Sequence, residues 1–203
     1  MAQIFGEFIE DFSERSEFLV LGFSPSSMPI QQRWKTNGLS ADFLGDYVKN
    51  FFPGDTSAAL SKQTEIAAAV SFVANELLEN AMKYSDINAG LPINLEVHLF
   101  SDRLIFVSKN SLYPETIPEF QLYIQKIMTG DIAEMYVEQI EKSSASEDTG
   151  KSGLGYLTML MDYEALLGWQ FTTSPKLFKS LVDQKPQEQD VVTVVTTMVQ
   201  LPL

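Results

Sequence analysis

The longest segment with regular hydrophobic spacing runs from about Thr56 to Ser85. Its apolar residues recur at intervals of three and four, which places them on one stripe of a helix: Ile66, Val70, Val73, Leu77, Ala81 and Tyr84. This spacing predicts one long helix. A shorter helical pattern over 41–52 precedes it and stops at Pro53 and Gly54, which disfavour continuation of a helix.

Strand patterns lie on both sides of the long helix. Residues 93–100 (INLEVHLF) and 103–110 (RLIFVSKN) are joined by Ser101 and Asp102 and predict an antiparallel hairpin. In the first of these strands apolar and polar residues alternate, which indicates one covered face and one wet face. Further strands are predicted over 17–24, 30–40, 168–175 and 191–203.

Two short helices are predicted over 118–131 and 132–144, and another over 154–167. This order of elements predicts an α+β fold, a two-layer sandwich with a mixed, mostly antiparallel sheet and helices on one face. We expect a single domain over 1–203. Its successive parts are the N-terminal strands and helix, the long helix with the hairpin, a lid with a glycine-rich loop, and the C-terminal helix and strands (1–55, 56–110, 111–155 and 156–203).

Composition narrows the classes of function. The formal net charge is −13, and a surface this acidic disfavours nucleic acid and anionic membrane as partners. The chain has no cysteine, which excludes thiol chemistry and thiolate metal sites. It has a single histidine, His98, which disfavours a Ser-His triad. Acidic residues interrupt the apolar N-terminus, and no segment has the length of a membrane span, so we expect a cytoplasmic protein.

The stretch NELLENAMKYS (75–85) carries the first candidate chemistry. At about 100° per residue, Glu76, Asn80 and Lys83 fall within an arc of about 60° beside the apolar stripe. Their oxygens suit a hard cation such as Mg²⁺, and the ammonium suits a phosphate. The alternative is an ordinary amphipathic helix with a minor Glu79–Lys83 surface pair.

The stretch TGKSGLG (149–155) carries the second. Its glycines let backbone N–H groups approach a ligand, and the helix that follows adds its unpaired N-terminal amides, so the segment is suited to bind an anion. A Walker A loop is rejected, because that motif needs a glycine where the chain has Ala145. The two stretches together indicate a magnesium–nucleotide site.

These motifs resemble those of the GHKL ATPase superfamily, which includes histidine kinase catalytic domains and anti-sigma-factor serine kinases. Residues 76–85 look like its N box, and residues 150–155 (GKSGLG) look like its glycine-rich G2 box. More narrowly, the run from FVSKN through MYVEQI to TGKSGLGYLTM resembles SiaB-type protein kinases. The resemblance covers most of the chain from about Ile66 onward and implies the Bergerat fold.

The resemblance also implies roles for individual residues. Glu76 matches the position of the general base or its support, and Asn80 matches the asparagine that coordinates magnesium. The positions that would contact the ATP ribose and phosphates are Lys83, Tyr84, Gly150, Lys151, Gly153, Leu154 and Gly155. These roles agree with phosphoryl transfer, which depends mostly on positioning and on neutralising charge.

One departure from the family pattern concerns the base. The G1 box should supply an aspartate that accepts the adenine amino group, and this chain has FVSKNSLYP at that place. Asn110 could offer its side-chain oxygen instead, as the SiaB-type pattern also does, but an amide is a poorer acceptor than a carboxylate. The alternative is a turn residue with no nucleotide role.

The implied function is a Mg²⁺- and ATP-dependent serine/threonine kinase of the partner-switching type. Its substrate would be a STAS-domain (anti-sigma-factor antagonist-like) protein, and the family leaves a homodimer open. The altered G1 box keeps an alternative, a non-catalytic protein-binding module of the same fold with weak or lost nucleotide binding. A structural domain without a ligand is the third hypothesis.

Overall fold

The protein is described here by a computed structural model, which places residues 2–11, 17–25, 30–145, 153–175 and 191–203. Six strands form one sheet in the order β1-β5-β6-β4-β3-β2, and every neighbouring pair is antiparallel. The strands are β1 (Gln3–Gly6), β2 (Glu17–Phe23), β3 (Ile93–Leu99), β4 (Arg103–Leu112), β5 (Leu166–Pro175) and β6 (Val191–Pro202). The helices are α1 (Ile30–Lys49), α2 (Ser57–Tyr84), α3 (Ile117–Thr129), α4 (Ile132–Ala145) and α5 (Gly155–Asp162), with short 3₁₀ turns at Ile87–Ala89 and Pro114–Thr116.

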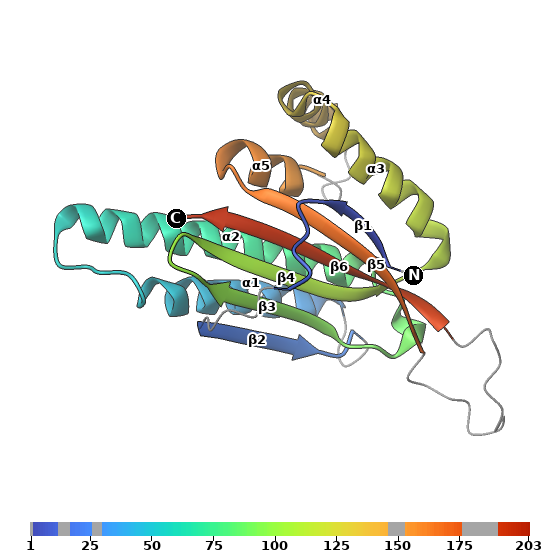
Figure 1. The fold of residues 1–203 in the computed structure, drawn as a ribbon, viewed down its shortest axis with the longest axis horizontal. Helices are drawn as coiled ribbons and strands as arrows, with labels where there is room; N and C mark the ends of the chain where they lie inside the picture. The colour runs from blue at the N-terminus through green and yellow to red at the C-terminus, as the bar shows by residue number, and fades with distance from the viewer. Residues whose placement is uncertain (1, 12–16, 26–29, 146–152, 176–190) are drawn as a thin grey trace.

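The main core lies between the sheet and the helical layer. The long helix α2 runs behind the central strands, with α1 beside it, and α3 and α4 project beyond β5 and β1 (Figure 1). Residues from α2, α5 and the central strands form one continuous apolar cluster, which includes Leu77, Leu157, Phe106 and Val199. This arrangement confirms the expected α+β two-layer architecture, although the described sheet is antiparallel throughout rather than mixed.

The opposite face of the sheet is covered in part by the segment that follows β1. Phe8 and Ile9 pack on a second, smaller cluster formed by Ile105, Val107 and Met198. The backbone of this segment crosses so close to β5 that a side chain at Gly168 would meet Phe8. The helical face therefore holds most of the core, and the N-terminal segment covers the centre of the other face.

Most elements agree with the sequence predictions. The long helix is α2, and its first turn is capped by Thr56, whose hydroxyl accepts a hydrogen bond from the Ala59 amide at 3.2 Å. The hairpin is β3–β4, with its register centred on Val97 opposite Phe106. On β3 the residues alternate between buried and partly exposed, as the pattern predicted.

The strand predicted over 30–40 is wrong, because these residues form the first half of α1. Asn37, Ala41, Leu44 and Val48 are buried at intervals of four, three and four, which is a helical period. The buried positions of α1 thus begin with a polar residue, Asn37. The hydrophobic pattern therefore does not reveal that the helix starts before residue 41. The helix predicted over 154–167 also ends early, at Asp162, and the chain turns through Glu164, which has a φ of 50°, into β5.

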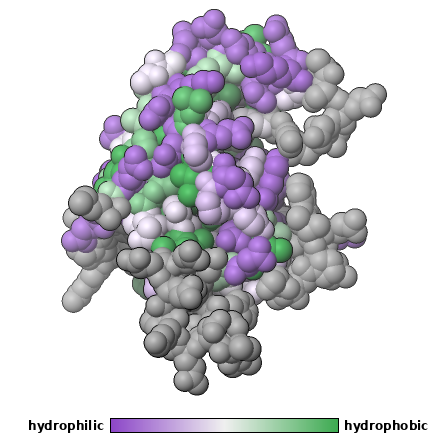
Figure 2. Space-filling view, turned by 90° about the vertical axis from the view of Figure 1, so that its right-hand side faces the viewer, coloured by the Kyte–Doolittle hydropathy of each residue, from purple (hydrophilic) through white to green (hydrophobic). Residues whose placement is uncertain are grey.

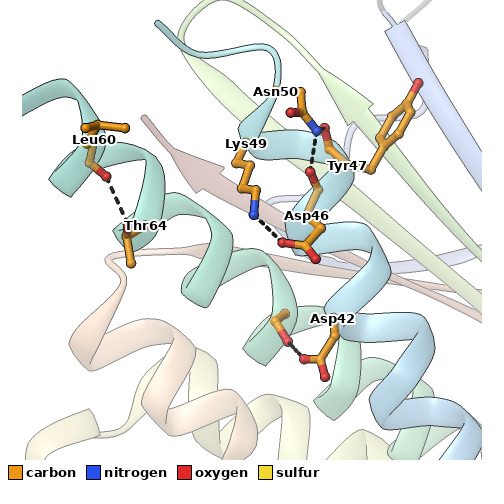
Figure 3. A network of polar contacts seen from close by, with 8 residues as sticks. Asp42, Asp46, Tyr47, Lys49, Asn50, Leu60 and Thr64 are labelled. Atoms are coloured by element: carbon orange, nitrogen blue, oxygen red, sulfur yellow. Dashed lines mark hydrogen bonds and ion pairs between the residues drawn. The ribbon is translucent and has the colours of Figure 1, made fainter. Parts of the chain in front are cut away.

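Polar contacts line the exposed side of the α1–α2 pair (Figure 3). The Ser71 hydroxyl on α2 donates to the Asp42 carboxylate on α1 at 2.8 Å. Within the last turns of α1, Lys49 pairs with Asp46, and the Asn50 side chain donates to the Asp46 backbone carbonyl at 2.6 Å. Such exposed contacts contribute little to stability, so buried packing holds the two helices together.

The described surface is mostly polar at the end of the molecule that carries α3. Figure 2 shows hydrophilic residues predominating on this face, with hydrophobic residues scattered among them. Among the described helices, none is both long enough and apolar enough to cross a bilayer.

Candidate functional site

A cavity of about 480 Å³ opens between α2, the sheet and the α3–α4 pair. Its floor is formed by β4 and β6, one wall by the second half of α2, and the opposite side by α3, α4 and the start of α5. The volume lies in the range of small-molecule sites, about 300 to 1,000 Å³.

The α2 wall carries the polar residues that the sequence singled out. Glu76, Asn80 and Lys83 all line the cavity. They lie at the edge of the buried stripe of α2, where Leu77 and Ala81 face the core. Tyr84 also lines the cavity and is 44% exposed, and the Lys83 ammonium lies 5.4 Å from the centre of its ring. The helix therefore presents a carboxylate, an amide and an ammonium to one volume.

The glycine-rich turn lies on the far side of the same cavity. Gly153 has a φ of +60°, a conformation that favours glycine, and Gly155 begins α5 directly against Glu76. A side chain at position 155 would overlap the Glu76 carboxylate, so the observed position of that carboxylate depends on glycine here. Leu154 occupies the N-cap of α5 and does not line the described cavity. Gly150 and Lys151 lie outside the described residues.

Helices α3 and α4 close the side of the cavity above the glycine turn. The Tyr123 hydroxyl on α3 donates to the Gly153 carbonyl at 3.2 Å, and the Gln139 side chain on α4 packs against Gly153. Burial raises the pKa of Tyr123 to about 12, with smaller contributions from Tyr156 and Tyr84. The Tyr123 hydroxyl is therefore protonated, and able to donate, throughout the physiological range.

The sheet floor is polar but carries no charge among its described cavity-lining residues. Ser108 and Asn110 come from β4, and Thr197 and Val195 come from β6. The Asn110 amide nitrogen donates to the Ser111 carbonyl at 2.9 Å. Because a backbone carbonyl can only accept, this contact fixes the orientation of the amide. Asn110 thus lies in the cavity, with its side-chain oxygen as the remaining acceptor.

Charged groups gather above the floor. Glu76, Glu79 and Glu119 line the cavity together with Lys83. Burial raises the pKa of Glu76, and the nearby Glu79 carboxylate raises it further. A carboxyl group with a raised pKa accepts a proton more readily than usual, which suits a general base.

Asn80 lies beside the Tyr156 hydroxyl of α5. Burial raises the pKa of Tyr156, and hydrogen bonds with neighbouring side chains, Thr197 and Asn80 among them, act in the opposite direction. The Asn80 amide also lines the cavity, where its oxygen can accept a hydrogen bond or coordinate a cation.

The described residues contain no cluster of three or more His, Cys, Asp or Glu side chains placed to hold a metal ion alone. A cation at Asn80 would need most of its oxygens from a ligand, and Mg²⁺ bound with nucleotides commonly takes its ligands from phosphates and water. The donor set on α2 is consistent with that kind of shared site.

Several lining residues are not evident from the sequence, notably Ser108, Thr197, Tyr123 and Tyr156. Ser108 and Thr197 interrupt two apolar strands on the face that packs against the helices, and this is the only signal that could have identified them. Tyr123 and Tyr156 lie within apolar helical patterns, where an aromatic residue predicts packing rather than a site.

No protein-family model, no curated protein and no solved structure matches this chain. The resemblance to GHKL ATPases therefore rests on the N-box-like and G2-box-like residues, of which Glu76, Asn80, Lys83, Tyr84, Gly153 and Gly155 line the cavity.

Proposed function

We propose that this chain is an ATP-binding serine/threonine protein kinase of the GHKL type that acts in the cytoplasm. One observation carries the proposal: α2 and the glycine turn before α5, far apart in sequence, face each other across a single cavity. Gly155 lies against Glu76 there, so the described end of the glycine-rich stretch and the α2 motif border one cavity.

The residues divide between the two ends of a nucleotide. Lys83 and the backbone of the glycine turn would hold the phosphates, and Asn80 would offer its amide oxygen to Mg²⁺. Tyr84 would lie beside the ribose, and the neutral floor with Asn110 would accept the base. When bound, Mg²⁺ supplies neutralisation of phosphate charge, which is the main requirement of phosphoryl transfer.

Glu76 would act on the incoming hydroxyl group. Its partial burial and the neighbouring Glu79 raise its pKa, which favours proton acceptance. Its position against Gly155, at the start of α5, places a carboxylate where the phosphate end of the nucleotide is expected. The roof formed by α3 and α4 would exclude water from the transfer.

The proposed protein substrate is a small STAS-domain partner, as in partner-switching systems, and a homodimer is compatible with the proposal. A second candidate is a non-catalytic protein-binding module with weak or lost nucleotide binding. The amide at position 110, where the superfamily has a carboxylate, favours this candidate because it weakens the interaction with an adenine amino group.

The two candidates differ in what they do with ATP. Calorimetric titration with ATP, in Mg²⁺ and then in EDTA, tests binding, and ATP at 100 times its dissociation constant should raise the unfolding free energy by about 2.7 kcal/mol. Glu76→Gln should retain ATP binding but lose transfer of labelled phosphate to a STAS-domain protein. Binding without transfer in the wild type would favour the binding module, and no binding at millimolar ATP would overturn the kinase and leave only the binding module.

A further inference from the structure

The most unusual polar group in the cavity is the hydroxyl of Ser108. Ser108 lies on β4 directly opposite Thr197 of β6, and both side chains are on the helix-facing side of the sheet. The residue is 2% exposed, and its hydroxyl has no hydrogen-bond partner among the described residues. A buried hydroxyl without a partner costs folding free energy, so this position is unfavourable for the isolated fold.

Other polar side chains near Ser108 have partners, apart from the indole nitrogen of Trp169 on β5. The Ser111 hydroxyl, on the other face of β4, donates to the Asp86 carbonyl at 3.1 Å. Thr197 hydrogen-bonds with the Tyr156 hydroxyl, and the Asn110 nitrogen donates to the Ser111 carbonyl. Three described buried side chains have a polar atom without a hydrogen-bond partner, Arg103, Ser108 and Trp169, and of these only Ser108 lines the cavity.

We infer that Ser108 forms a hydrogen bond with the ring edge of an uncharged, amino-substituted heterocyclic base bound on the cavity floor. The inference rests on the proposed function and names the residue that would read the base. The described floor is neutral, whereas the carboxylates and the ammonium lie on α2 and α3, so the floor suits the uncharged part of a ligand.

The donor and acceptor pattern of the floor selects the kind of edge. Asn110 presents its side-chain oxygen as an acceptor, because its nitrogen donates to the Ser111 carbonyl. Ser108 can donate to an unprotonated ring nitrogen. A 6-aminopurine offers an amino donor next to a ring acceptor and complements both residues, whereas a 6-oxopurine would set a carbonyl against the Asn110 oxygen. The floor thus compensates for the missing carboxylate with a second hydrogen bond.

The test uses the full chain and two serine variants. Ser108→Ala should unfold at the wild-type temperature or slightly above it, because the removed hydroxyl has no partner to lose. It should weaken the affinity for ATP, and for adenosine, by about tenfold, which corresponds to one hydrogen bond. The control Ser111→Ala should lower the unfolding temperature by about 2 to 4 °C and leave the ATP affinity unchanged.

Base analogues identify the contact. One of the two analogues, 1-deaza-ATP or 7-deaza-ATP, should bind to wild type more weakly than ATP does. Ser108→Ala should lose that discrimination. If wild type binds ATP but Ser108→Ala binds it equally well, or still discriminates, the inference is overturned and the proposed function stands. If wild type binds neither ATP nor adenosine, the proposed function fails, and the inference fails with it.

Discussion

The hydroxyl of Tyr123, in the middle of α3, donates a hydrogen bond of 3.2 Å to the backbone carbonyl of Gly153, two residues before α5 begins. The two residues are 30 positions apart in sequence. This bond links the roof of the cavity to the turn that is expected to hold phosphates. The position of α3 and the conformation of the glycine turn are therefore coupled through one side chain.

Tyr123→Phe tests this link. It keeps the aromatic packing and removes only the hydroxyl, so we expect a loss of stability of about 1 kcal/mol. Because the hydrogen bond fixes the roof on the turn, nucleotide should also dissociate several-fold faster. Stopped-flow measurement of dissociation, with urea unfolding in parallel, checks both effects.

The matched control is Tyr136→Phe on α4, since Tyr136 does not line the described cavity. It should leave the dissociation rate unchanged. A Tyr123→Phe protein whose nucleotide dissociates at the wild-type rate would show that the bond does not hold the roof closed.

Asn80→Ala is expected to remove the magnesium-dependent part of ATP binding. The Asn80 oxygen is the one amide oxygen that α2 presents to the described cavity. Loss of its hydrogen bond to Tyr156 should also lower stability by about 0.5 to 1.5 kcal/mol. Calorimetric titrations with ATP in Mg²⁺ and in EDTA should give the same affinity for the variant and different affinities for wild type.

Asn75→Ala is the matched control for that measurement. Asn75 lies one and a half turns earlier on α2, donates to Glu79 at 2.8 Å and does not line the described cavity. It should keep the difference between Mg²⁺ and EDTA. A difference that persists in Asn80→Ala would assign magnesium binding to other groups.

The fold was largely predictable because its longest elements carry strong periodicity. The α2 stripe and the β3 alternation each identify one buried face, and burial of that face decides the local structure. The first half of α1 was not predictable in this way. Its core contact there is the polar Asn37, and packing against α2 favours the helix more strongly than the local sequence does.

The site was predictable only in part. Glu76, Asn80 and Lys83 share an arc of one helix, so their convergence follows from helical geometry alone. Ser108 and Thr197 come together only because β4 and β6 are neighbours in the sheet. In sequence, the lid and α5 lie between these two strands, and no local pattern specifies that the strands pair.

Two glycines in α1 should respond in opposite ways to alanine. A Cβ at Gly45 would lie 2.6 Å from the Ala67 backbone carbonyl of α2, whereas a Cβ at Gly38 would meet nothing within 4 Å in the described structure. Gly45→Ala should therefore push the two helices apart and cost about 1 to 3 kcal/mol. Gly38→Ala should stabilise the helix by about 0.5 to 1 kcal/mol.

Urea unfolding of both variants measures these changes, and Gly38→Ala serves as the control for helix propensity. The two substitutions are identical and lie on the same helix, so the difference between them reports the α1–α2 contact. Equal changes of the same sign would show that α1 does not pack on α2 at Gly45.

The raised pKa of Glu76 makes the stability depend on pH. Burial, followed by Glu79, raises the pKa in the folded state above the ordinary value of about 4.3, so the folded protein binds this proton more tightly than the unfolded chain. The contribution of Glu76 to stability is thus fully present below about pH 4.3. It is lost as pH rises through the raised pKa of the folded state, where the carboxyl ionises.

Glu76→Gln should remove this dependence, because glutamine has nearly the same shape and no charge. At neutral pH the variant should be more stable than wild type, and the difference should shrink toward zero in acid. Urea unfolding from acid to neutral pH measures this difference in stability, and the exposed Glu138→Gln is the control with little expected change.

The same ionisation of Glu76 should govern catalysis, since only the ionised carboxylate can accept a proton. Phosphate transfer should therefore rise over the pH range in which the stability advantage of glutamine appears, and transfer that is flat across that range would separate Glu76 from the chemical step.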